Sequence, residues 1–165
     1  MHLAGHSFRA STPALRLHGG FTLVELMLAI AILAVLVAIA VPSYQIYSER
    51  IKVQRAETDI LLLSAAIDMY DRDNQEYPTN LAVTGNADML DPWGRPYKYL
   101  RLSPLDGSAA GLRRKDRNLV PINSDYDLYS MGKDGKTAAQ FTAKKARDDV
   151  VRANDGDYYG LAENH

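Results

Sequence analysis

Residues 21–41 read FTLVELMLAIAILAVLVAIAV, and this run decides the fold of the 165-residue chain. Its only charged residue is Glu25, and its only other polar side chain is that of Thr22. As an α-helix the run would be about 32 Å long, enough to cross the hydrocarbon core of a bilayer. A helix in a soluble core rarely stays apolar around its whole circumference, so the pattern favours a retained membrane helix over a buried core helix.

Composition and charge exclude several other classes of protein. Apolar residues make up 47% of the chain and charged residues 24%, which is a globular balance. Lys and Arg number 19 against 20 Asp and Glu, so no overall basic field points to nucleic acid as a partner. The absence of Cys excludes disulfides and thiol catalysis, and no pattern of catalytic residues is discernible, so we do not expect an enzyme.

The residues that flank the apolar run indicate its orientation in the membrane. The run also divides the chain into three parts. Residues 1–20 contain Arg9 and Arg16 and no acid, so by the positive-inside rule this segment stays in the cytoplasm. We expect a leader at 1–20, a membrane helix at 21–42 and a globular domain at 43–165, which would face outward.

Helical periodicity resumes directly after Pro42, which we expect to bend the helix without ending it. Tyr77-Pro78 makes continuation of the helix past that point unfavourable, and we predict one helix over residues 22–73. The apolar residues beyond Pro42 that recur on one face are Ile46, Val53, Ala56, Ile60, Leu63, Ile67 and Tyr70.

Short strands are predicted beyond the helix, between turn residues. The best candidates are residues 97–102 and 125–130, and two strands alone would be marginal in water. We therefore expect an α+β fold, in which a small antiparallel sheet packs on the apolar stripe of the helix and a loop region follows. The basic run LRRKDRN at 112–118 predicts a solvated loop rather than a nucleic-acid-binding surface.

Glu25 is the candidate functional residue of the membrane helix. A carboxylate in hydrocarbon costs about 2.5–3.5 kcal/mol on insertion scales, so such a residue needs a partner. Cleavage after Gly20 would create an amino group on Phe21, and Glu25 of a neighbouring subunit could pair with it and set the assembly register. The alternative is that Glu25 is only a helix-start acid that reaches toward the interface.

The segment from Gly20 to Glu25, followed by the apolar run, resembles the processing site of type IV prepilins and pseudopilins. The resemblance implies that a prepilin peptidase removes the prepilin leader between Gly20 and Phe21 and that Phe21 is then N-methylated. Residues 90–100 (LDPWGRPYKYL) and 125–135 (DYDLYSMGKDG) are similar to the major pseudopilins of type II secretion, the general secretion pathway protein G family. A type IV pilin-like fold is implied.

By this resemblance, the chain would be a structural subunit of a pseudopilus, which helps export folded proteins across the bacterial outer membrane. It would be a single-pass inner-membrane protein with a periplasmic domain. Its expected partners are copies of itself, the prepilin peptidase, minor pseudopilins and the inner-membrane assembly platform. The alternatives are a surface type IV pilin for adhesion, motility or DNA uptake, and a monomeric membrane-anchored calcium-binding module.

A calcium site is predicted near the C-terminus. Asp134 lies in a turn, and a loop could bring it close to Asp148 and Asp149; such hard oxygen donors suit calcium. The resemblance to major pseudopilins also implies a calcium site here, with backbone carbonyls from Leu128, Met131 and the residues between them.

Two other interpretations of these acidic residues stay open in the sequence. Nearby basic residues such as Lys133 and Lys136 would compete with a cation, so the three aspartates could simply be solvated turn residues. Asp155 and Asp157 resemble a fragment of a calcium loop but lack the distal glutamate of an EF-hand, which makes them a weaker second candidate.

Overall fold

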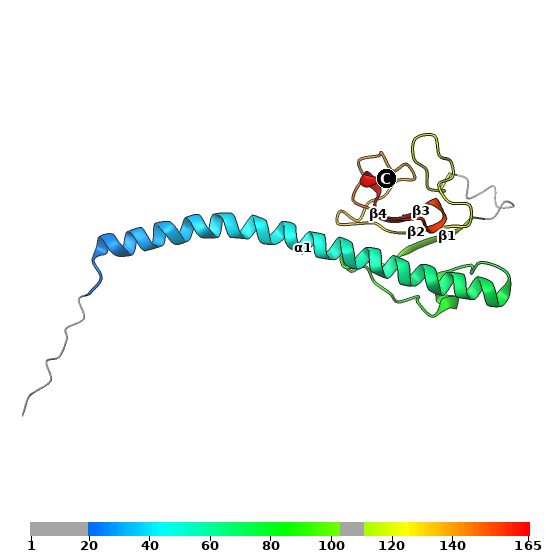
Figure 1. Ribbon diagram of the computed structural model, residues 1–165, viewed down its shortest axis with the longest axis horizontal. Coiled ribbons are helices and arrows are strands. Elements are labelled where there is room, and N and C mark those ends of the chain that lie inside the picture. Colours follow the sequence, from blue (N-terminus) through cyan, green and yellow to red (C-terminus); the bar gives the residue numbers. More distant parts are fainter. Residues whose placement is uncertain (1–19, 103–110) are drawn as a thin grey trace, which may run out of the picture. The chain divides into compact units, whose positions relative to one another are not determined.

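The computed structural model of the chain describes residues 20–102 and 111–165 (Figure 1). Its contacts divide the chain into two compact units, Met1–Pro42 and Ser43–His165. The predicted leader at 1–20 lies outside the described residues except for Gly20. The main elements in order are α1 (Leu23–Asn74), β1 (Lys98–Arg101), β2 (Tyr126–Ser130), β3 (Val150–Ala153) and β4 (Tyr158–Leu161).

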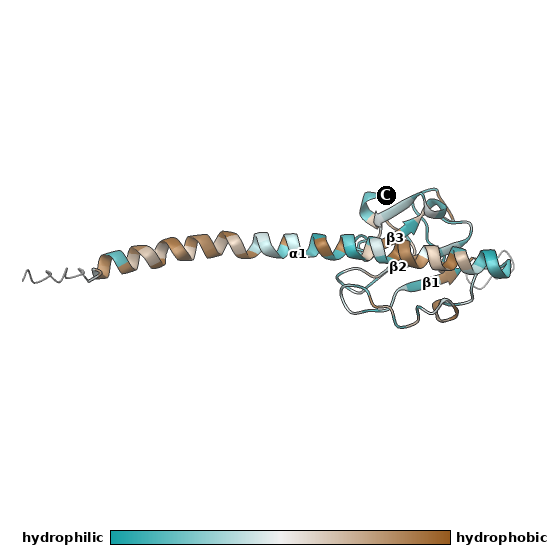
Figure 2. Cartoon of the chain, turned by 60° about the horizontal axis from the view of Figure 1, so that its bottom comes forward, coloured by the Kyte–Doolittle hydropathy of each residue, from teal (hydrophilic) through white to brown (hydrophobic). Residues whose placement is uncertain are grey.

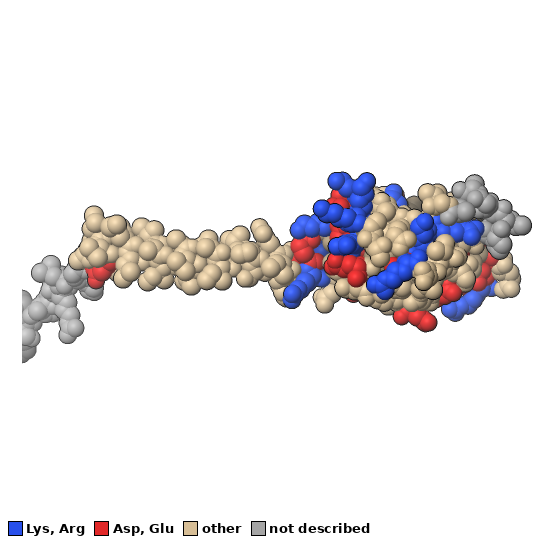
Figure 3. All heavy atoms as spheres, turned by 90° about the horizontal axis from the view of Figure 1, so that it is seen from above, with Lys and Arg blue, Asp and Glu red and all other residues tan. Residues whose placement is uncertain are grey.

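Helix α1 confirms the helix predicted over residues 22–73 and runs through Pro42. Figure 2 shows the first half of α1 as mostly hydrophobic, with a hydrophilic patch near its start and paler turns toward its middle, and Figure 3 shows the same half without charge beyond its first turn. Within the described residues, α1 contains one segment long and apolar enough to cross a membrane, and none of that segment is buried by the protein. This exposure argues against a core helix, whose apolar surface would be covered.

The second half of α1 is amphipathic and supplies the core of the globular unit. Ala56, Ile60, Leu63 and Ile67 are buried at spacings of three and four residues, which confirms this part of the predicted stripe. Ile46, predicted on the same stripe, is instead 57% exposed. It lines an open groove with Leu161, because the sheet does not cover this turn of the helix.

The sheet has four antiparallel strands in the order β1-β2-β3-β4. Strands β1 and β2 lie within the two predicted segments and pair in register, with Tyr99 opposite Leu128. Strands β3 and β4 were not predicted. They form a hairpin in which Val151 lies opposite Gly160. The pattern that could have revealed it is the turn sequence NDGD at 154–157, between a valine pair and a tyrosine pair.

Adjacent residues of β3 face two different cores, because successive side chains of a strand point to opposite faces. Val150 packs in the cluster that contains the buried stripe of α1. Val151 packs on the other face, in a second cluster with Ile122, Phe141 and Ala162. These partners come from the long connections and the C-terminal end, so irregular segments cover the sheet face that α1 leaves open.

Candidate functional site

The start of α1 holds Thr22 and Glu25 together in a capping arrangement. The carboxylate oxygen Glu25 Oε2 accepts hydrogen bonds from the Thr22 backbone N–H and hydroxyl, both at 2.8 Å. The Glu25 backbone N–H in turn donates to Thr22 Oγ1 at 3.2 Å. Threonine and glutamate at this spacing form a capping box, which satisfies backbone donors that have no partner at a helix start.

Gly20 and Phe21 immediately precede this cap and are exposed, with Phe21 86% exposed. A side chain at Gly20 would meet no atom of the described chain within 4 Å. The predicted cleavage point is therefore open to an enzyme from the side of the described residues. Cleavage and methylation themselves stay predictions.

Asp134 and Asp148 come close together, as the calcium prediction requires. The Asp134 backbone N–H donates to Asp148 Oδ2 at 2.8 Å. The carboxylate of Asp134, however, accepts the Lys136 backbone N–H at 2.7 Å and so turns back on its own loop. Gly132, at φ +58°, lies so close to Asp148 that a Cβ there would be 1.9 Å from the Asp148 carbonyl oxygen.

Asp149 is completely buried and has different partners from the other two aspartates. Its Oδ2 accepts the Thr137 hydroxyl at 2.6 Å and a hydrogen bond from the guanidinium of Arg114. Burial raises the pKa of the Asp149 carboxyl above its ordinary value, and Arg114 and Thr137 partly offset this effect. Its second oxygen, Oδ1, has no hydrogen-bond partner among the described residues.

Arg114 is the important residue that sequence reasoning missed. It belongs to the basic run at 112–118, for which a solvated loop was predicted, yet it is only 2% exposed. The prediction was wrong at this position because the long connections fold over the second face of the sheet and enclose the side chain. The run contains four basic residues around Asp116, and no local signal distinguishes the buried one.

The three predicted calcium ligands do not form one group in the described residues. No group of three or more His, Cys, Asp or Glu side chains among residues 20–102 and 111–165 could hold a metal ion. Leu128 and Ser130 lie inside β2, which pairs with β1 on one side and with β3 on the other, so most of the proposed carbonyl donors belong to the sheet. Calcium binding by the three aspartates stays a prediction of the sequence.

Of the weaker candidate pair, Asp155 and Asp157, the first has a structural role. Asp155, in the turn between β3 and β4, accepts hydrogen bonds from the Ser124 backbone N–H at 2.6 Å and from its hydroxyl at 2.9 Å. Asp157 is exposed in the same turn. Asp155 therefore joins the β3–β4 turn to the segment before β2.

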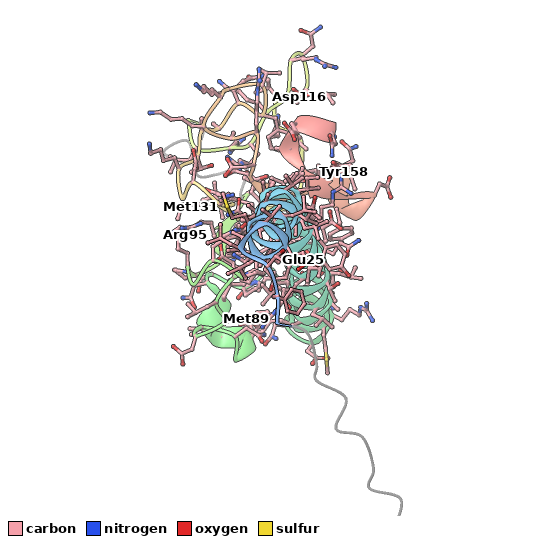
Figure 4. The ribbon with its side chains drawn as sticks, turned by 90° about the vertical axis from the view of Figure 1, so that its left-hand side faces the viewer. Glu25, Met89, Arg95, Asp116, Met131 and Tyr158 are labelled. Carbon is pink, nitrogen blue, oxygen red and sulfur yellow. The ribbon has the colours of Figure 1, made fainter. Side chains whose placement is uncertain are left out.

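The Asp-Pro-Trp-Gly segment forms a turn that the sheet and helix hold in place. Asp91 accepts the backbone N–H groups of Trp93 and Arg95 at 3.0 and 2.8 Å and the Ser130 hydroxyl at 2.5 Å. Arg95 donates to the Gly132 carbonyl, and Figure 4 shows it on the same side of the domain as Met131. Trp93 packs against the core, as a packing residue would.

Comparison with known proteins gives matches to both parts of the chain. Residues 15–41 match the family described as "Prokaryotic N-terminal methylation motif". The chain is also 34% identical over 142 residues to the type II secretion system core protein G of Pseudomonas aeruginosa, covering 73% of this chain and 87% of that protein.

Other proteins of that name give similar matches. The core protein G of Klebsiella pneumoniae is 35% identical over 123 residues, covering 71% of this chain and 78% of its own. The Vibrio cholerae protein is 31% identical over 148 residues, covering 78% and 89%. No solved structure matches the chain.

Proposed function

We propose a function from the premise that this chain belongs to the type II secretion system core protein G family: it is a structural pseudopilin that polymerises into a filament. The single observation that carries this proposal is the extent of the similarity. The matches cover 71–78% of the chain, which is far more than the methylation motif at 15–41 and so includes much of the globular unit. The motif alone would suit surface pilins equally well.

The structure supports this function at the helix start. The apolar half of α1 is unburied in the single chain, so it needs either lipid or the apolar helices of other subunits around it. We propose that it anchors the subunit in the inner membrane and forms the filament core after assembly. The globular unit would then lie in the periplasm.

Processing at the exposed Gly20–Phe21 bond prepares the subunit for assembly. Cleavage by a prepilin peptidase would leave Phe21 as an N-methylated terminal residue, one residue before the Thr22–Glu25 cap. In the filament, the Glu25 carboxylate would pair with the Phe21 amino group of a neighbour. Minor pseudopilins and an inner-membrane assembly platform are the proposed further partners.

Two measurements on the protein in its bacterial host test the proposal. Mass spectrometry of the purified protein is expected to find a chain that begins at Phe21 and carries one additional methyl group. Deletion of the gene is expected to leave folded secretion substrates in the periplasm, and expression of the intact chain is expected to restore their export. An uncut leader, or unchanged secretion with loss of surface pili, would contradict the pseudopilin assignment.

A further inference from the structure

We infer that the guanidinium of Arg114 is a built-in cation that holds the C-terminal connection onto the sheet and makes the fold independent of calcium. The sequence predicted calcium between Asp134, Asp148 and Asp149, and at Asp149 the structure supplies a cation from the protein itself. The side chain of Arg114 is 3% exposed and that of Asp149 is 0% exposed. The two charges are thus paired away from solvent.

The oxygen atoms around this guanidinium are of the types that bind a hard metal ion. Its Nη1 donates to Thr137 Oγ1 at 2.7 Å and to the Ala138 carbonyl oxygen. Its Nη2 donates to the Asp149 carboxylate. One hydroxyl, one carbonyl and one carboxylate oxygen therefore converge on a cation that is part of the chain.

Aromatic rings close the site from the side. The guanidinium carbon lies 3.8 Å from the centre of the Tyr129 ring and 5.5 Å from that of Phe141. The nearer distance is well inside the range of a cation–π interaction, and both rings help to exclude water. A calcium ion at Asp149 would be repelled by the adjacent guanidinium.

Backbone hydrogen bonds of Arg114 and Lys115 show which segments meet at this site. Its N–H donates to Asp127 Oδ2 at 2.8 Å, and its carbonyl accepts the Ile122 N–H at 3.0 Å. The next residue, Lys115, bonds to the Ala139 carbonyl at 2.9 Å and to the Phe141 N–H at 3.0 Å. Arg114 thus joins the segment before β2 to the connection before β3.

The connection between β2 and β3 needs specific contacts to hold it on the sheet. Residues 131–149 contain neither helix nor strand, and the whole chain contains no Cys that could close the loop with a disulfide. An irregular segment of this length covers a core only if specific contacts order it. The buried guanidinium provides contacts to three of its residues, Thr137, Ala138 and Asp149.

Thermal unfolding of the full-length chain in detergent tests the inference. The midpoint Tm of the wild-type protein is expected to be the same in CaCl2 and in EGTA, and calorimetric titration with CaCl2 is expected to give no saturable heat. A native-state site at about 100-fold its Kd would raise Tm by several degrees, so such a rise would overturn the inference. This test needs no variant and does not depend on filament assembly.

Substitutions of Arg114 and its neighbours test the role of the arginine directly. Arg114→Met keeps most of the side-chain length without the charge and is expected to lower Tm, whereas Arg117→Met, on the exposed end of the same loop, is expected to leave it unchanged. Arg114→Met combined with Asp149→Asn should lower Tm by less than the sum of the single changes, because both remove one interaction. Additive effects, or an unchanged Tm for Arg114→Met, would overturn the inference.

Discussion

The indole Nε1 of Trp93 donates a hydrogen bond to Glu49 Oε2 at 3.2 Å, joining residues 44 positions apart in the chain. The other carboxylate oxygen of Glu49 lies 3.3 Å from Lys52 Nζ on the same helix and 3.7 Å from Lys133 Nζ. One carboxylate of α1 thus connects the turn after the helix with the connection that follows β2.

Acid is expected to weaken this junction. Burial raises the pKa of Glu49, but the hydrogen bond from Trp93 and the charges of Lys52 and Lys133 outweigh it, so the net pKa lies below its ordinary value. A group with a lowered folded-state pKa contributes stability above its unfolded pKa, and that contribution is lost as the pH falls through the folded value. We expect the loss below about pH 4.

The fluorescence of Trp93, the only tryptophan, measures this change. We expect its emission to shift as the pH falls below about 4, while the protein is still folded. Glu49→Gln keeps an oxygen acceptor but no titrating group, so its emission should be flat over the same interval. An identical acid shift in both proteins would contradict the assignment to Glu49.

Two neighbouring leucines of α1 form a matched test of the helix–sheet core. Leu63 is 1% exposed and Leu62 is 59% exposed. Leu63→Ala is expected to lower the free energy of unfolding by about 2–5 kcal/mol, because it leaves a cavity in the core. Leu62→Ala should change it by less than about 0.5 kcal/mol. Chemical denaturation of the two variants compares them directly, and equal losses would disprove the packing described here.

Gly132 is expected to be intolerant of any side chain. Alanine there would need a left-handed backbone at φ +58° and would place its Cβ against the Asp148 carbonyl. Gly132→Ala should therefore cost at least about 2 kcal/mol of stability. The control is Gly85→Ala, where φ is +78° but no atom lies within 4 Å, with an expected cost of about 1 kcal/mol. Similar Tm values for the two variants would argue against the close approach.

Substitutions of Glu25 separate its charge from its capping role. Glutamine serves at this position of a capping box as glutamate does, so Glu25→Gln keeps the cap to Thr22 and removes only the charge. We expect Glu25→Gln and Glu25→Ala to insert and be processed normally, and both to lose efficient assembly. Electron microscopy of sheared filaments gives the yield. Normal filament yield from Glu25→Gln would show that capping alone explains this residue.

The long helix and the first two strands were predictable because their signals are local. An apolar run of 21 residues, a repeat of apolar residues such as Ile60 and Leu63, and the break at Tyr77-Pro78 act within a few turns of one element. The predicted processing motif is equally local, since a peptidase would recognise adjacent residues such as Gly20 and Phe21. For these features, the sequence by itself determined both the fold class and the family expectation.

Tertiary structure alone decided the environment of the C-terminal loops. Asp149 and Arg114 are 35 residues apart, and nothing near either residue indicates that they meet. Their pairing depends on two irregular connections folding over the same sheet face, beside Tyr129 and Phe141. Burial makes a charge costly unless it is paired, and burial is a property of the assembled cores. For the same reason Arg114 is an internal cation, although a solvated loop was predicted for the basic run that contains it.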